Sequence, residues 1–300
     1  MPRRNLLIAG LAAVVLIAAA VFVAVALTRE DGDEGPRLAG RVAVRDGCGL
    51  THMWPDGTDL RKLCLKDIWE AVSLSFDGKT LAWDSITGSQ FAITLAAPDA
   101  TGQRPVALPQ GVSIDPSLSP EGDEVAFLHS SRDDGRYDIW TTSTTAPTDQ
   151  SQQVTALRDV SSVAWSPKGD RLVYVANWSE DTLEGDIFVA RPNGDDVTSL
   201  GQGDAPGWAP DGKQLVFVHG GSLWTIGADG KDRRLLVRRG ESPAWSRDGT
   251  LIAFMREERC SRAVCKDRVF VVSPDGTGVR AVGPSFLGAR QIIWLPDPNE

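Results

Sequence analysis

The chain has 300 residues, of which 42% are hydrophobic, and a formal net charge of −9. The apolar content is sufficient for a large buried core, whereas the acidic balance excludes nonspecific nucleic-acid binding, which requires a basic surface. Ten Trp and only two Tyr are present. Because most of the Trp recur at equivalent positions of a repeat, we interpret them as packing residues rather than ligand-stacking residues.

The first 40 residues predict a membrane anchor. Residues 6–27 contain no charged side chain, and about 20 apolar residues are enough to span a bilayer. Arg3 and Arg4 precede this stretch and acidic residues follow it, which places the N-terminus in the cytoplasm and the remainder outside. We therefore expect a cytoplasmic tail (1–4), a transmembrane signal-anchor helix (5–27) and a tether (28–40).

Cleavage of this segment is the alternative. Ala24-Val25-Ala26 resembles a signal-peptidase site, and Arg3-Arg4 faintly resembles a twin-arginine signal. The apolar stretch is longer than the roughly 7–15 residues of a secretory signal core, which favours an uncleaved anchor. Both alternatives export the remaining domain, either as a single-pass membrane protein or as a secreted one.

The four cysteines fit an exported protein. Cys48 and Cys64 are equidistant from Asp56, the centre of a Pro-Asp-Gly turn, so a hairpin there would bring the two sulfurs opposite each other. Cys260 and Cys265 close a short loop. We expect the disulfides Cys48–Cys64 and Cys260–Cys265. We expect no metal site, because Cys-x-x-Cys is absent and the three His are scattered.

One phrase recurs through the rest of the chain: a turn of the type Ser-Pro-Asp-Gly that follows an apolar stretch and precedes an apolar triplet. Its copies occupy residues 75–78, 119–122, 166–169, 209–212 and 246–249, with a divergent sixth copy at 295–298. The copies are spaced by 37 to 49 residues. A period in this range, with strand signals throughout, predicts a β-propeller.

Each repeat predicts one blade of four strands. Pro, Asp and Gly suit the tight turn that ends the first strand. The second strand, for example residues 171–175, is apolar throughout, as expected for a strand covered on both sides by neighbouring blades. A third strand such as 186–188, a second Gly turn and a more polar fourth strand follow.

The two ends of the domain predict how the ring closes. Residues 41–44 match a second strand, and 50–54 and 60–65 match a third and a fourth. Residues 291–295 match a first strand, so the C-terminal strand would complete the blade that begins at residue 41. The predicted fold is therefore an all-β, six-bladed propeller over residues 41–300, with one blade shared by both termini and with few open sheet edges.

The repeat resembles that of TolB-type propellers, in which an apolar-Trp-Ser-Pro-Asp-Gly-x-x-Leu-Ala-Phe phrase is followed by Asp-Ile-Trp and a second Asp-Gly turn. The resemblance covers residues 41–297 and departs at the N-terminus, where TolB carries a small α/β domain. TolB binds a peptidoglycan-associated lipoprotein and other periplasmic proteins. The resemblance implies the propeller fold and, by analogy alone, an extracytoplasmic protein partner.

Binding is expected on the face that carries the loops between second and third strands and between blades, because these are long and varied. We call it the loop face, and the opposite side the turn face. Aligning the repeats places charged residues where the innermost strands begin: Glu70, Asp115, Asp204, Glu241 and Arg290. Carboxylates around the channel mouth would attract a cation or a basic side chain of a partner. A solvated polar rim is the alternative.

Two aromatic residues in loops between blades, Trp69 and Phe286, would be binding anchors if exposed, and packing residues if tucked in. His129 and His219 stand at equivalent positions, seven residues after the turn glycine. We interpret them as exposed polar residues at strand ends rather than as a metal-binding or pH-sensing pair.

The sequence favours binding over catalysis. Gly-x-Ser-x-Gly is absent, and the Asp and Gly of the turns adjoin, unlike those of sialidase Asp boxes. We expect a non-catalytic module without cofactors that binds an extracytoplasmic protein or a cell-envelope ligand. Two alternatives remain: a carbohydrate or small-ligand sensor that uses the channel mouth, and a glycosidase that uses two of its carboxylates.

Overall fold

A computed structural model describes residues 21–22, 40–46, 49–65, 67–87, 90–132, 134–182, 184–258 and 266–295. These residues form 24 strands and no helix. Within them, no helix has the length and apolar character needed to cross a bilayer. The predicted anchor helix (5–27) lies outside the described residues except for β1 (Val21–Phe22), which runs parallel to the last strand of the chain.

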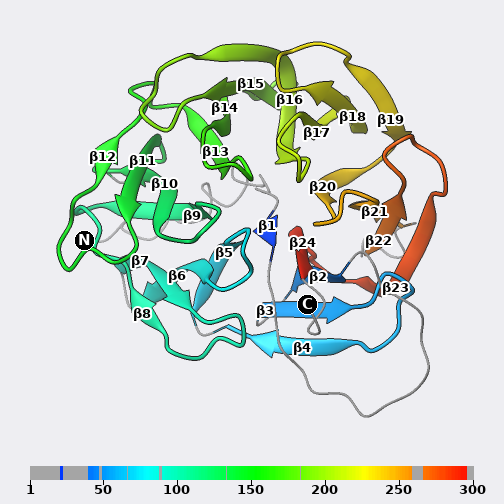
Figure 1. Cartoon of the computed structure of the whole chain (residues 1–300), viewed down its shortest axis with the longest axis horizontal. Coiled ribbons are helices and arrows are strands. Elements are labelled where there is room, and N and C mark those ends of the chain that lie inside the picture. The colour runs from blue at the N-terminus through cyan, green and yellow to red at the C-terminus, as the bar shows by residue number, and fades with distance from the viewer. Residues whose placement is uncertain are drawn as a thin grey trace, which may run out of the picture.

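The strands form antiparallel sheets arranged radially around a common axis, which is the arrangement of a β-propeller (Figure 1). Three sheets have four strands each. They contain β5 (Ile68–Leu74), β6 (Leu81–Thr87), β7 (Gln90–Ala96) and β8 (Arg104–Pro105); β9 (Val112–Leu118), β10 (Glu124–Ser130), β11 (Asp138–Ser143) and β12 (Gln152–Gln153); and β20 (Glu241–Trp245), β21 (Ile252–Glu257), β22 (Asp267–Val272) and β23 (Arg280–Phe286).

A fourth sheet joins the two ends of the domain. It combines β1 and β24 (Gln291–Leu295) with β2 (Arg41–Asp46), β3 (Gly49–Met53) and β4 (Arg61–Cys64). β24 pairs antiparallel with β2 along its whole length, with Val42 opposite Trp294. The predicted pairing of the C-terminal strand with the strand at residue 41 is therefore present.

The fifth sheet has seven strands: β13 (Val160–Trp165), β14 (Leu172–Ser179), β15 (Glu184–Ala190), β16 (Thr198–Trp208), β17 (Gln214–His219), β18 (Ser222–Gly227) and β19 (Arg234–Arg238). The described strands thus make five hydrogen-bonded sheets where six separate ones were predicted. The reason is β16, whose first half pairs with β15 and whose second half pairs with β17. A Cβ at Gly203, where the partner changes, would lie 2.6 Å from Phe217 Cδ2, so glycine is required there.

The core lies between neighbouring sheets and is built by the second strands. Their aromatic residues Trp83, Phe127, Phe217 and Phe254, which occupy equivalent repeat positions, are fully buried. Two indoles also join innermost strands through hydrogen bonds. Within the seven-stranded sheet described above, Trp208 Nε1 of β16 donates to Ala164 O of β13 (3.3 Å), and between two sheets Trp294 Nε1 of β24 donates to Ala244 O of β20 (2.9 Å). The interpretation of the repeated Trp as packing residues is confirmed for these two.

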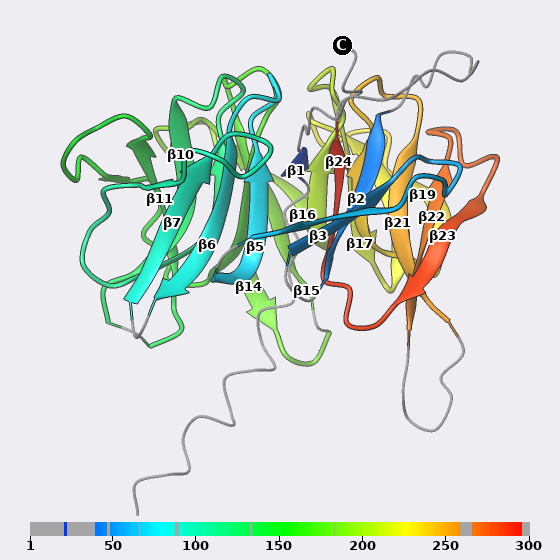
Figure 2. The same cartoon turned by 90° about the horizontal axis from the view of Figure 1, so that it is seen from below.

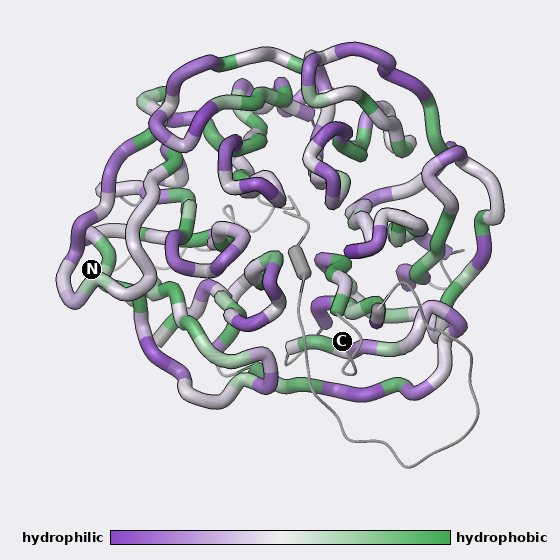
Figure 3. Tube along the Cα trace, in the orientation of Figure 1, coloured by the Kyte–Doolittle hydropathy of each residue, from purple (hydrophilic) through white to green (hydrophobic). Residues whose placement is uncertain are grey.

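The repeated turns lie together on one side of the ring (Figure 2). In the first copy, Ser75 Oγ donates to Asp77 Oδ1 (2.6 Å) and accepts from Thr80 N (2.9 Å), while Gly78 takes a positive φ of 75°. These turns are hydrophilic at the inner ends of the blades (Figure 3). Their uniformity contrasts with the opposite, loop face.

Candidate functional site

The innermost strands are distorted where they begin, at the loop face. Asp115, Ala205 and Ser242 have positive φ angles near 50°, and the pairing register shifts beside each of them. A proline follows each of these residues. Proline is tolerated because β-bulges and sheet edges do not require its missing N–H. The predicted channel-mouth residues therefore lie on or beside irregular backbone rather than on regular strands.

Asp115 and Arg290 differ in exposure. Asp115 is buried, and its backbone N–H donates to Asp84 Oδ2 (3.2 Å), which belongs to the preceding sheet. Asp84 Oδ1 also accepts from Ala71 N (2.8 Å), so this buried carboxylate ties two sheets together. Arg290 is exposed and donates its backbone N–H to Arg45 O (3.1 Å). For Glu70 the structure describes only its place in β5.

Asp204 lies in a cluster with Glu184 and His219. Burial, together with the negative charge of Glu184, raises the pKa of Asp204 to about 7. Glu184 accepts hydrogen bonds from His219 Nδ1 (2.7 Å) and from Gly220 N (2.5 Å). The carboxyl groups of Asp204 and Glu184 therefore share one site at the loop face. At neutral pH Asp204 is present in both its charged and its uncharged form.

A second group of carboxylates surrounds Glu241; we call Glu241, Glu257 and Asp267 the acidic corner. Burial and then the charges of Asp267 and Glu257 raise the pKa of Glu241. Glu257 and Asp267 are directly paired across β21 and β22, where like charges repel. Neither Glu241 nor Asp267 forms an ion pair within the residues that the structure describes. This corner would gain from an incoming positive charge.

The two candidate anchors, Trp69 and Phe286, differ in exposure in the structure. Trp69 is 42% exposed and makes an edge contact with Phe91, with ring centroids 5.7 Å apart. Phe286 is only 6% exposed and packs in a core cluster with Val282 and Ile292. Its role is therefore packing, the tucked-in alternative.

The exposed apolar residue of that loop is Leu287, with 67% of its surface exposed. Trp69, in β5, and Arg290, three residues after Leu287, both bond to Arg45 of β2. Arg45 Nη2 donates to Trp69 O (2.5 Å), and Arg45 O accepts from Arg290 N. We call Trp69 and Leu287 the apolar patch. In the sequence, Leu287 is marked only as an apolar residue beside Gly288, a weaker signal than its aromatic neighbour Phe286.

The histidines and cysteines complete the predicted residues. His129 is buried rather than exposed: its Nδ1 lies 3.0 Å from Ser113 Oγ and its ring packs edge-on against Trp140. The interpretation of His129 as an exposed residue is wrong, because the strand end is covered by the next strand. Cys64 is disulfide-bonded. Its predicted partner Cys48, and the predicted pair Cys260–Cys265, lie outside the described residues.

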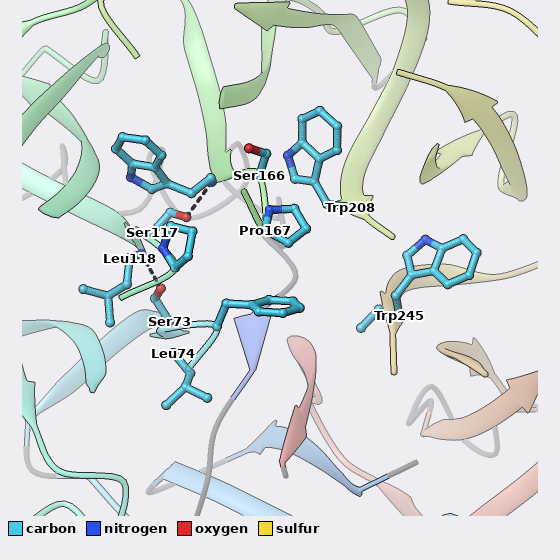
Figure 4. Close-up of a pocket in the computed structure, with 12 residues that line it drawn as sticks. Ser73, Leu74, Ser117, Leu118, Ser166, Pro167, Trp208 and Trp245 are labelled. Atoms are coloured by element: carbon cyan, nitrogen blue, oxygen red, sulfur yellow. Dashed lines mark hydrogen bonds between the residues drawn. The ribbon is translucent and has the colours of Figure 1, made fainter. Parts of the chain in front are cut away.

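The turn face carries a cavity that sequence reasoning did not single out (Figure 4). Residues from neighbouring sheets line it, including Phe76, Pro167, Trp208 and Trp245. Hydrogen bonds fasten the strands around it: Leu118 N donates to Ser73 Oγ (2.8 Å), and Trp165 N donates to Ser117 Oγ (3.0 Å). Its volume of about 40 Å³ has room for water only. We interpret it as a junction between blades rather than a ligand site.

Residues 55–287 match the family model described as the TolB beta propeller domain (PD40). Three solved structures show the same fold. TolB from Acinetobacter baumannii has a TM-score of 0.71 at 18% identity, covering 87% of this chain and 68% of that one. A TolB-type protein from Agrobacterium tumefaciens has a TM-score of 0.66 at 19% identity, covering 87% and 95%.

The third similar structure is a chain of a nidogen/laminin complex, with a TM-score of 0.62 at 13% identity, covering 84% of this chain and 97% of that one. No curated protein matches the chain. At these identities the solved structures establish the fold alone.

Proposed function

Because the chain belongs to the TolB β-propeller domain family, we propose that it is a non-catalytic binding module that holds an extracytoplasmic protein against its loop face. The loops of that face provide two kinds of recognition surface, and the sheets beneath them provide a rigid base. The similar chain from the nidogen/laminin complex comes from a structure in which two proteins associate, which supports the class of partner by analogy.

The observation that carries the proposal is the combination of the acidic corner with the apolar patch on one face. Trp is among the residues that most often form the hot spots of protein interfaces, which favours the exposed Trp69, and the exposed Leu287 would add apolar contact area. Carboxylates that repel each other supply electrostatic complementarity to basic side chains. We therefore propose a partner segment that combines basic and apolar residues.

The proposed module also has a defined number of blades and a membrane anchor. We count the ring as six blades, supported by the change of partner within β16, which lets one strand serve two blades. We also propose that residues 5–27 anchor the domain to the membrane and hold it outside the cytoplasm, supported by the charge pattern around that stretch. In the anchored form Val21 and Phe22 would leave the pairing with β24 that they make as β1.

The apolar patch is tested by the double variant Trp69→Ala/Leu287→Ala. We expect capture of a partner by cross-linking in intact cells to fall at least tenfold, because truncating buried interface anchors costs about 2 kcal/mol or more. The matched control is Val197→Ala/Val279→Ala, which truncates two exposed apolar residues beside the turn-face ends of β16 and β23. The same species captured equally by both double variants would overturn the proposed surface.

The channel mouth is tested separately by Glu70→Ala with Glu241→Ala. We expect folding to be retained and capture to weaken several-fold, with a smaller difference from the unaltered protein at high salt, since screening weakens charge attraction. Thermal melting followed by circular dichroism checks the folding. Unchanged capture at low salt would exclude the channel mouth as part of the site.

Membrane attachment is tested by removing residues 1–27 and replacing them with a cleavable secretion signal. We expect the full chain to sediment with membranes after alkaline extraction and the replaced form to appear outside the cytoplasm in soluble fractions. A full chain that is released by alkaline extraction would contradict an anchor helix.

A further inference from the structure

A second cavity, of about 220 Å³, opens at the loop face of the β9–β12 sheet. It lies between the loop that joins β10 to β11 and the connection that leads from β12 to β13. Its lining includes Arg132, Arg136, Arg158, Asp138, Trp140 and Gln153. We call it the arginine pocket. It is a different place from the acidic corner and the apolar patch.

The charge of this pocket is unusual for an acidic protein. Three of its lining residues are arginines and one is a carboxylate. Arg158 forms an ion pair with Asp134, at the edge of the pocket. Arg132 and Arg136 make no ion pair or side-chain hydrogen bond within the part of the chain that the structure describes. Two guanidinium groups therefore remain available at the same cavity.

The lining carboxylate does not compete for these arginines. Asp138 is buried, and its Oδ1 accepts hydrogen bonds from Leu157 N (2.7 Å), Arg158 N (2.9 Å) and Thr155 Oγ1 (3.1 Å). Its Oδ2 lies 3.3 Å from Gln153 Nε2. These bonds fasten the β12–β13 connection to β11. The backbone that carries Arg158 is thus fixed before any ligand enters, which reduces the entropy lost on binding.

One side of the pocket is aromatic and uncharged. The rings of His129 and Trp140 pack edge-to-face with centroids 5.1 Å apart. Burial lowers the pKa of His129, which keeps its ring neutral at pH 7. An aromatic side chain in the same cavity as guanidinium groups is suited to a ligand that has a ring and one anionic substituent, because arginine matches carboxylates with two parallel N–H groups.

From this arrangement we infer that the arginine pocket binds a small organic carboxylate of about one sugar ring in size, with its carboxylate on Arg132 and Arg136 and its ring against Trp140. The inference does not depend on the proposed protein partner, because the two surfaces share no residue. The pocket would make the protein a small-ligand binder in addition to its role as a docking surface.

The test uses the purified full chain and D-glucuronate as the probe, with D-glucose as the neutral analogue, in isothermal titration calorimetry. We expect glucuronate to bind and glucose not to bind. The double variant Arg132→Gln/Arg136→Gln is expected to weaken glucuronate binding at least tenfold, since both charge-assisted contacts are lost. The matched control is Arg238→Gln/Arg239→Gln, which removes the same charge from exposed residues beside β19 and β20.

Each outcome decides the matter. Binding that is lost in the pocket variant and retained in the control supports the inference, provided that both variants melt at the temperature of the unaltered protein. Absence of glucuronate binding, equal binding of glucose, or equal weakening in both double variants would overturn it. The last result would show attraction by overall charge rather than by this pocket.

Discussion

Deleting residues 291–300 is expected to abolish cooperative folding of the propeller. The deletion removes β24, whose Ile292, Ile293, Trp294 and Leu295 are all buried in the core. Each large buried side chain is worth about 2–5 kcal/mol, so the four together amount to about 8–20 kcal/mol, as much as the 5–15 kcal/mol by which a domain is usually stable. Circular dichroism melting should show a broad, low-temperature transition or none.

The loss is large because β24 is fastened on two sides. It forms the complete ladder with β2. Its first residue, Gln291, also bonds to the neighbouring sheet: Val72 N donates to Gln291 Oε1 (3.1 Å), and Gln291 Nε2 donates to Val72 O (3.2 Å). Without β24, β2 would expose an unpaired edge, and Val72 of β5 would lose both of its hydrogen bonds to the Gln291 side chain.

Two smaller changes at the C-terminus serve as controls for the deletion of residues 291–300. Removing residues 296–300 alone should leave the melting temperature nearly unchanged. Trp294→Phe keeps most of the packing and loses the 2.9 Å hydrogen bond to Ala244 O, so it should cost about 1–2 kcal/mol. A protein lacking 291–300 that melts like the full chain would show that the closure has no energetic role.

Asp204→Asn is expected to raise the free energy of unfolding above that of the unaltered chain at pH 8, and to leave it nearly unchanged at pH 4. The folded-state pKa of Asp204 is about 7, against an ordinary value of 3.8. Between these values the folded state holds more protons than the unfolded state, so raising the pH lowers the stability. At about 1.4 kcal/mol per pKa unit, the difference of about 3 units makes the penalty above pH 7 about 4 kcal/mol.

The variant removes this penalty because asparagine imitates the uncharged acid. Urea unfolding at pH 4 should give similar free energies for both proteins, and the curves should separate as the pH rises toward 8. Glu184, His219 and, beyond them, Arg233 face the same region, so a control at an exposed carboxylate, Asp181→Asn, should leave the pH dependence unaltered. Parallel curves for all three proteins would refute the assignment to Asp204.

The regular parts of the fold could be predicted because each repeat carries its own local signals. The turn at 75–78 forms with the aspartate and glycine geometry that the sequence indicates, and Trp294 packs as its repeat equivalents suggested. The closing pair of strands followed from matching the ends of the chain to the repeat. All these features depend on a few neighbouring residues or on counting copies.

The features that could not be predicted depend on contacts between distant segments. The alignment of the repeats placed Phe286 in a loop, whereas β23 extends as far as Phe286. Because successive residues of a strand point to opposite sides, Phe286 is buried and Leu287, the next residue, is exposed. The burial of His129 and the role of Asp84 arise from adjacent sheets. The joining of two sheets by β16 required knowing that Gly203 allows close approach of Phe217 and Ile187.

The unbroken course of β16 has a mechanical consequence. Wherever a connecting segment links two blades, the blades can tilt or separate a little while the segment takes up the movement. No separate connecting segment exists between β15 and β17, since the continuous strand β16 pairs with both, although its backbone takes positive φ angles at Gly201 and Ala205. We therefore expect relative movement of neighbouring sheets at other places, such as between β4 and β5, which belong to different sheets. Trp69 lies in β5, close to this boundary. A bound partner that contacts both β4 and β5 would restrict the relative movement of their two sheets.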